Sequence, residues 1–85
     1  MILHNVNFYH NMLNDYMLQD IKNCNYNYYQ HNINFYNYVK NIKDSVNSTF
    51  DYNNDNYIDV MNYLNKRLND TITEIEYYNR YVKVS

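Results

Sequence analysis

The last third of the chain, from Tyr57 to Val82, reads YIDVMNYLNKRLNDTITEIEYYNRYV and has the most regular pattern of apolar residues in the sequence. Large apolar side chains recur there at alternating intervals of four and three residues, with Thr71 filling the one gap. This spacing places side chains on one side of an α-helix. The residues of this series, the apolar seam, are Tyr57, Met61, Leu64, Leu68, Ile75, Tyr78 and Val82. The seam predicts a long amphipathic helix over residues 56–82.

Two upstream segments repeat the helical spacing less regularly, which predicts helices over residues 2–21 and 28–47. The first segment has its apolar positions at Ile2, Val6, Tyr9, Leu13, Tyr16, Met17 and Ile21, and the second series runs through Tyr28, Asn32, Phe35, Val39, Ile42 and Val46. A strand is the alternative at the start of each, because Ile2, Val6 and Phe8 fit a two-residue alternation and Tyr26–Phe35 is rich in strand-favouring residues. Helix is favoured because the spacing persists beyond the usual strand length.

Two polar breaks, around residues 22–26 and 47–56, separate the three segments. Asn23 and Asn25 in the first break are expected to make a turn or a cap, and Asn56 is expected to be the N-cap of the third helix with Asp59 three residues later. Short loops between amphipathic helices are typical of antiparallel neighbours. The sequence therefore predicts an all-α fold, a single small domain over residues 1–85 with an antiparallel three-helix arrangement and a long C-terminal helix.

The composition is dominated by Asn and Tyr, and Gly, Pro and Trp are absent. Because GC-rich codons specify the missing residues, the composition is typical of an AT-rich genome. A chain of this length buries only about 60–65% of the surface that it exposes when unfolded. A protein partner or self-association is therefore expected.

Charge and residue content argue against several classes of function. The net charge is −2, with seven basic and nine acidic residues, which does not suit binding to nucleic acid or to an acidic membrane surface. No apolar run is long enough to span a membrane and no signal segment follows Met1, so we expect a soluble protein inside the cell, in the cytoplasm or an organelle matrix. The sequence offers neither a catalytic constellation nor a cofactor motif. We expect no enzyme activity and no cofactor.

Four residues have side chains that can bind zinc, namely His4, His10, Cys24 and His31. Their spacing matches no short zinc-binding pair, so they are interpreted as surface histidines and a lone thiol. One cysteine also excludes a disulfide within the chain.

The segment from Asp51 to Asn62 has acidic and amide side chains at the spacing of a calcium loop. Asp51, Asn53, Asp55 and Asp59 fall at places one, three, five and nine, and in this respect the segment resembles the loop of EF-hand proteins. That resemblance implies weak calcium binding by these four residues. The segment departs from the family pattern at Asn56, where the family has Gly, and at Asn62, where it has Glu. A capped loop between two helices, without metal, is the preferred interpretation.

These observations favour a non-catalytic protein–protein interaction or assembly factor that binds through an amphipathic, tyrosine-rich helical surface. The seam is expected either to close the bundle or to dock a partner helix. Three tyrosines beside the seam, Tyr63, Tyr77 and Tyr81, are expected to be exposed and to join the interface. The alternatives are a calcium-responsive module and a small virus- or phage-encoded inhibitor of a host enzyme.

Overall fold

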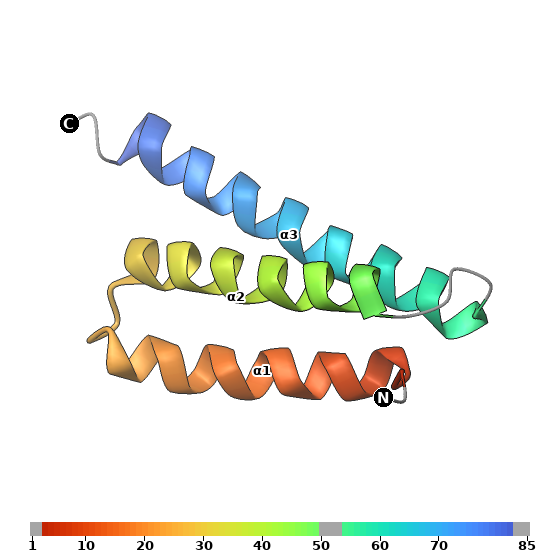
Figure 1. Cartoon of the computed structure of the whole chain (residues 1–85). Coiled ribbons are helices and arrows are strands. Elements are labelled where there is room, and N and C mark those ends of the chain that lie inside the picture. The colour runs from red at the N-terminus through yellow and green to blue at the C-terminus, as the bar shows by residue number, and fades with distance from the viewer. Residues whose placement is uncertain (1–2, 50–53, 83–85) are drawn as a thin grey trace.

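The protein consists of three helices in a computed structural model that describes residues 3–49 and 54–82 (Figure 1). The helices are α1 (Val6–Asn23), α2 (Tyr28–Thr49) and α3 (Asp55–Tyr81), and no strand occurs among the described residues. The chain runs back alongside itself at each connection, so neighbouring helices are antiparallel. The predicted all-α arrangement is confirmed. The strand alternatives are wrong, because helix covers Val6 and Phe8 in the first and all but Tyr26 and Asn27 in Tyr26–Phe35, where Tyr26 lies in the turn. Ile2 lies outside the described residues.

Asparagine side chains cap the start of every described helix. The Oδ1 atoms of Asn5, Asn27 and Asn54 accept hydrogen bonds from backbone N–H groups of the first turn, at 3.1, 3.1 and 2.8 Å. Each bond satisfies a donor that has no partner inside the helix. The N-cap of α3 is therefore Asn54. The prediction of Asn56 is wrong, because Asn56 already donates its backbone N–H to Asn54.

The turn between α1 and α2 is built without glycine. Asn25 and Tyr26 have φ values of 55° and 61°, in the left-handed region that glycine usually occupies. Their backbone N–H groups donate to Lys22 and Ile21 at 3.1 and 2.8 Å. This is the bonding pattern of a Schellman cap, with Asn25 in the position where helices commonly have glycine. Asn23, in contrast, is the last residue of α1.

The core lies between the three helices along the first two-thirds of α3. Four side chains are almost completely enclosed, namely Leu13 of α1, Val39 of α2 and Val60 and Leu64 of α3. Each contributes roughly 1.5–3 kcal/mol by leaving water. The other buried apolar residues are Leu3, Tyr9, Phe35, Val46, Tyr57 and Leu68.

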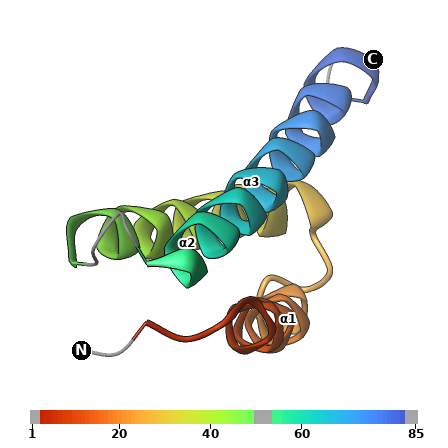
Figure 2. The ribbon, with the colours of Figure 1, turned by 90° about the vertical axis from the view of Figure 1, so that its right-hand side faces the viewer.

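α3 diverges from α2 toward its C-terminus (Figure 1), and the view turned by 90° shows its last turns projecting beyond the other helices (Figure 2). The molecule measures 48 × 24 × 18 Å and has a radius of gyration of 14.3 Å. A compact domain of this length has a radius of gyration of about 12 Å. The bundle is therefore elongated, and one end of α3 has little of its own chain around it.

Candidate interaction surface

The apolar seam divides into a buried part and a more exposed part. Its members Tyr57, Leu64 and Leu68 are buried, together with Thr71, and Met61 packs half-buried against the core. Ile75 and Tyr78 are half-buried and Val82 is 46% exposed. The seam was predicted either to close the bundle or to dock a partner helix. Its residues up to Thr71 close the bundle. Binding of a partner stays a prediction, and it concerns the last three turns of α3.

Val60 is the fully buried residue that the seam omitted. It lies three residues after Tyr57 and four before Leu64, so it also fits helical spacing. The structure places Val60 rather than Met61 at the centre of the helix contact.

Four exposed tyrosines come from two segments that lie toward the same end of the molecule, the α1–α2 connection and the end of α3 (Figure 1). Tyr26 and Tyr28 come from the turn and the start of α2, and Tyr77 and Tyr81 come from the end of α3. Their exposed fractions lie between 59% and 64%. We call these four residues the tyrosine end. Sequence reasoning missed Tyr26 and assigned Tyr28 to the core-facing series of the second helix, which the structure contradicts.

An aromatic contact joins the two parts of this end. The rings of Tyr29 in α2 and Tyr78 in α3 are stacked, with centroids 4.3 Å apart and planes inclined by 22°. The stack bridges the helices where they diverge, so it holds the end of α3 beside the start of α2. Both rings are half-buried.

Tyr77 and Tyr81 lie one helical turn apart, and their ring centroids are 5.0 Å apart. They line a shallow groove of about 200 Å³ on one face of α3, together with Thr73, Glu76 and Arg80. Because all five residues belong to α3, this groove is a surface feature of a single helix.

Tyr63 does not belong to the exposed set, contrary to the prediction. It is half-buried against the core, and its hydroxyl lies 2.9 Å from Nδ1 of His10 in α1. The hydroxyl also accepts a hydrogen bond from the Arg67 guanidinium at 2.8 Å. The guanidinium carbon lies 5.2 Å from the centroid of the Phe35 ring, in the geometry of a cation–π contact. Tyr63 therefore links α1 to α3.

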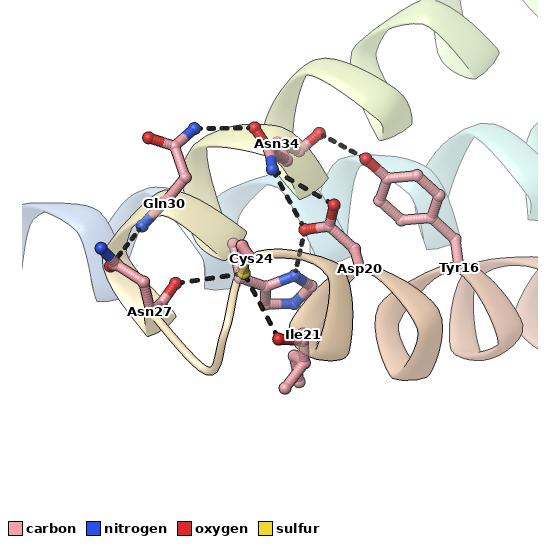
Figure 3. A network of polar contacts seen from close by, with 8 residues as sticks. Tyr16, Asp20, Ile21, Cys24, Asn27, Gln30 and Asn34 are labelled. Carbon is pink, nitrogen blue, oxygen red and sulfur yellow. Dashed lines mark hydrogen bonds and ion pairs between the residues drawn. The ribbon is translucent and has the colours of Figure 1, made fainter.

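A polar network joins the C-terminal half of α1 to the start of α2 (Figure 3). The Asp20 carboxylate lies 2.7 Å from Nδ1 of His31 and accepts hydrogen bonds from the Asn34 amide at 3.2 and 3.3 Å. Asn34 also accepts a bond from the Gln30 amide at 2.9 Å. Because the His31 side chain is 6% exposed and that of Asp20 is 13% exposed, the network fixes the register of α1 on α2.

The zinc-capable residues lie apart from one another. His4 stacks on Phe8, His10 contacts Tyr63, and Cys24 lies within 3.5 Å of the Ile21 and Asn27 carbonyl oxygens. His31 is buried, so its interpretation as a surface histidine is wrong. Across residues 3–49 and 54–82, no three His, Cys, Asp or Glu side chains are grouped so that they could hold a metal ion.

The predicted calcium loop is only partly described. Asp51 and Asn53 lie outside the described residues, whereas Asp55 is the first residue of α3 and Asp59 follows one turn later. Both described aspartates are exposed. Calcium binding by this segment stays a prediction.

Comparison with known proteins returns no relative. A scan against protein-family models finds no match, and searches of curated proteins and of solved structures find none either. None of the described helices combines the length and apolar content that crossing a membrane requires.

Proposed function

We propose that the protein is a non-catalytic interaction or assembly factor that binds a protein partner through the tyrosine end. The observation that carries the proposal is that four exposed tyrosines lie on two segments, the α1–α2 connection and the end of α3, that are found toward the same end of the bundle. Tyrosine combines a large apolar ring with a hydroxyl that hydrogen-bonds. It is therefore enriched at protein interfaces and among the residues that dominate binding energy.

The backbone at Tyr26 supports this proposal. A non-glycine residue in the left-handed region costs roughly 1–2 kcal/mol, and Asn tolerates the region better than Tyr does. Tyr26 nevertheless occupies it with φ 61° and with its side chain mostly in water. The hydrogen bond from its backbone N–H to the Ile21 carbonyl oxygen offsets this cost, and the exposed ring remains open to a partner.

The elongated shape supports the proposal as well. The core provides little enclosed apolar surface, and α1 contributes only Tyr9 and Leu13 as buried residues within its helix. Additional burial against a partner would stabilise such a small bundle, because a ligand that binds only the folded state shifts the folding equilibrium.

The proposal is tested by affinity capture from the organism that encodes the chain. We expect a Tyr77→Ala/Tyr81→Ala variant to lose at least about tenfold of its partner binding, because truncating interface tyrosines commonly costs more than 1.4 kcal/mol. The matched control is Ile58→Ala, which truncates another large exposed side chain of α3 at the opposite end of the helix. Equal capture by the wild type and both variants would contradict the proposal.

A further inference from the structure

The groove on α3 carries two opposite charges beside its exposed rings. Glu76 and Arg80 lie one helical turn apart, and both line the groove with Tyr77 and Tyr81. We call this side of the helix, formed by Thr73, Glu76, Tyr77, Arg80 and Tyr81, the outer face of α3. With a rotation of 100° per residue, it points about 170° from the half-buried Ile75 and about 130° from Tyr78, whose ring stacks on Tyr29 of α2. The outer face is thus directed away from α2.

Neither Glu76 nor Arg80 makes an ion pair or hydrogen bond through its side chain with any other residue in the described part of the chain. A helix face with an acid and a base at this spacing has charges complementary to those of a second copy of the same face in the opposite orientation. The same face turned end to end presents Arg80 where the first copy presents Glu76.

We propose that the outer face of α3 binds the same face of a second copy of this chain, with the two α3 helices antiparallel about a twofold axis. This inference rests on the proposed function and names the partner. A twofold axis near residue 78 places Glu76 of each copy opposite Arg80 of the other, so two ion pairs form, with Tyr77 between them and Tyr81 just outside them. A parallel pairing would oppose like charges, which costs free energy.

The area involved indicates a weak dimer. Because Tyr77 and Tyr81 are 59% and 64% exposed, the two rings can bury roughly 200–300 Å² on each side. A stable interface of standard size buries about 800 Å² per partner. We therefore expect a dissociation constant on the order of 10–1,000 μM. A high local concentration of the protein, or its place in a larger assembly, would still allow such a weak dimer to form.

Sedimentation equilibrium on the full chain tests the proposal over protein concentrations from about 1 μM to about 1 mM. The mass is expected to rise from 10.6 kDa toward twice that value. Charge reversals then test the pairing. Either Glu76→Arg or Arg80→Glu alone opposes like charges across the axis and should weaken self-association about tenfold.

Mixing the two single variants is the decisive measurement. Glu76→Arg has two bases on the outer face and Arg80→Glu has two acids, so the mixture should form a heterodimer at least as tight as the wild-type dimer. The double variant should dimerise with itself. Lys66→Glu, a reversal at another exposed position of α3, is the matched control and should leave association unchanged. Circular dichroism verifies that each variant keeps its helix content.

Three results would overturn self-association: a mass of 10.6 kDa at every concentration, single reversals that behave like the wild type, or a mixture that stays monomeric. If the chain is monomeric but still captures another protein in a manner that depends on Tyr77 and Tyr81, only the identity of the partner is wrong. If that capture also fails, the proposed function fails with it.

Discussion

At the scale of single residues, asparagine occupies the helix-capping and left-handed turn positions that serine and glycine occupy in most helical proteins. Asn5, Asn27 and Asn54 cap the helices, and Asn25 takes the left-handed position in the turn. The amide oxygen makes the capping bonds, and Asn is among the non-glycine residues that tolerate positive φ. A sequence without glycine or proline can therefore still cap three helices and form the turn between α1 and α2.

The Asp20 carboxylate is the centre of the polar network, and replacing it tests whether the network stabilises the fold. Asp20→Asn keeps the shape of the side chain but removes the charge that faces His31 and accepts from Asn34. We expect the free energy of unfolding to fall by about 2 kcal/mol, as for the loss of hydrogen bonds to a charged group. Urea denaturation at pH 7 measures this change. Asp15→Asn, on an exposed position of the same helix, should change stability by less than about 0.5 kcal/mol. Similar effects of the two substitutions would mean that the network contributes nothing to stability.

At the scale of the helix, α3 has a buried part and a half-buried part, and we expect them to contribute differently to the free energy of unfolding. Leu64 is fully buried, so Leu64→Ala removes enclosed apolar surface and should cost about 2–4 kcal/mol in the free energy of unfolding. Ile75 is only half-buried, so Ile75→Ala should cost about 1 kcal/mol. Urea unfolding followed by circular dichroism distinguishes the two values. Equal losses would show that the end of α3 is packed as tightly as its middle.

The apolar spacing was sufficient to predict α3, because Leu64 and Leu68 recur at helical intervals and nothing in the segment competes with a helix. The same spacing did not separate Val60 from Met61, since both lie one turn from Leu64 and the choice depends on the angle at which α2 crosses. It also placed Tyr28 toward the core, although this side chain is 62% exposed. Periodicity identifies one side of a helix but not which part of that side another helix covers.

The polar contacts were beyond sequence reasoning for a different reason. His31 lies four residues before Phe35 and so fits the buried series, which was a usable signal. Its partner Asp20 belongs to another helix, and only the relative position of α1 and α2 brings the two together. The tyrosine end was foreseen only in part. Tyr77 and Tyr81 were expected to be exposed, whereas the contribution of the α1–α2 turn depends on where that turn meets α3.

At the scale of the whole molecule, α1 packs less extensively against the other helices than α2 and α3 pack against each other. Tyrosines make several of its packing contacts. Tyr9 is buried among the core residues, and Tyr16 stacks on Tyr38 of α2 with ring centroids 3.8 Å apart. Burial raises the pKa of Tyr16 above the ordinary 10.0, and the negative charge of Asp20 raises it further. Burial also raises the pKa of Tyr9, opposed in part by a hydrogen bond with the His4 backbone. The folded state therefore favours the protonated form of both phenols.

This dependence predicts a loss of stability at alkaline pH. In the unfolded chain these phenols release their protons near pH 10.0, whereas in the folded chain they retain them to higher pH. Between those two pKa values the unfolded state binds fewer protons, so the free energy of unfolding falls as pH rises. Their contribution is fully present below pH 10 and is lost as pH passes the raised pKa values. Thermal unfolding from pH 8 to 11.5, about the practical range for phenol titration, measures the decline.

Substitution by phenylalanine separates this effect from general alkaline unfolding. Tyr16→Phe has no proton to lose and gives up only a long hydrogen bond, 3.5 Å from its hydroxyl to the Asn34 carbonyl oxygen. At pH 7 its melting temperature should therefore lie close to that of the wild type, while above pH 10 it should decline less steeply. Tyr9→Phe/Tyr16→Phe should decline least of all. Parallel curves for all three chains would show that the attachment of α1 does not depend on the protonation of these phenols, and that alkaline unfolding begins elsewhere in the bundle.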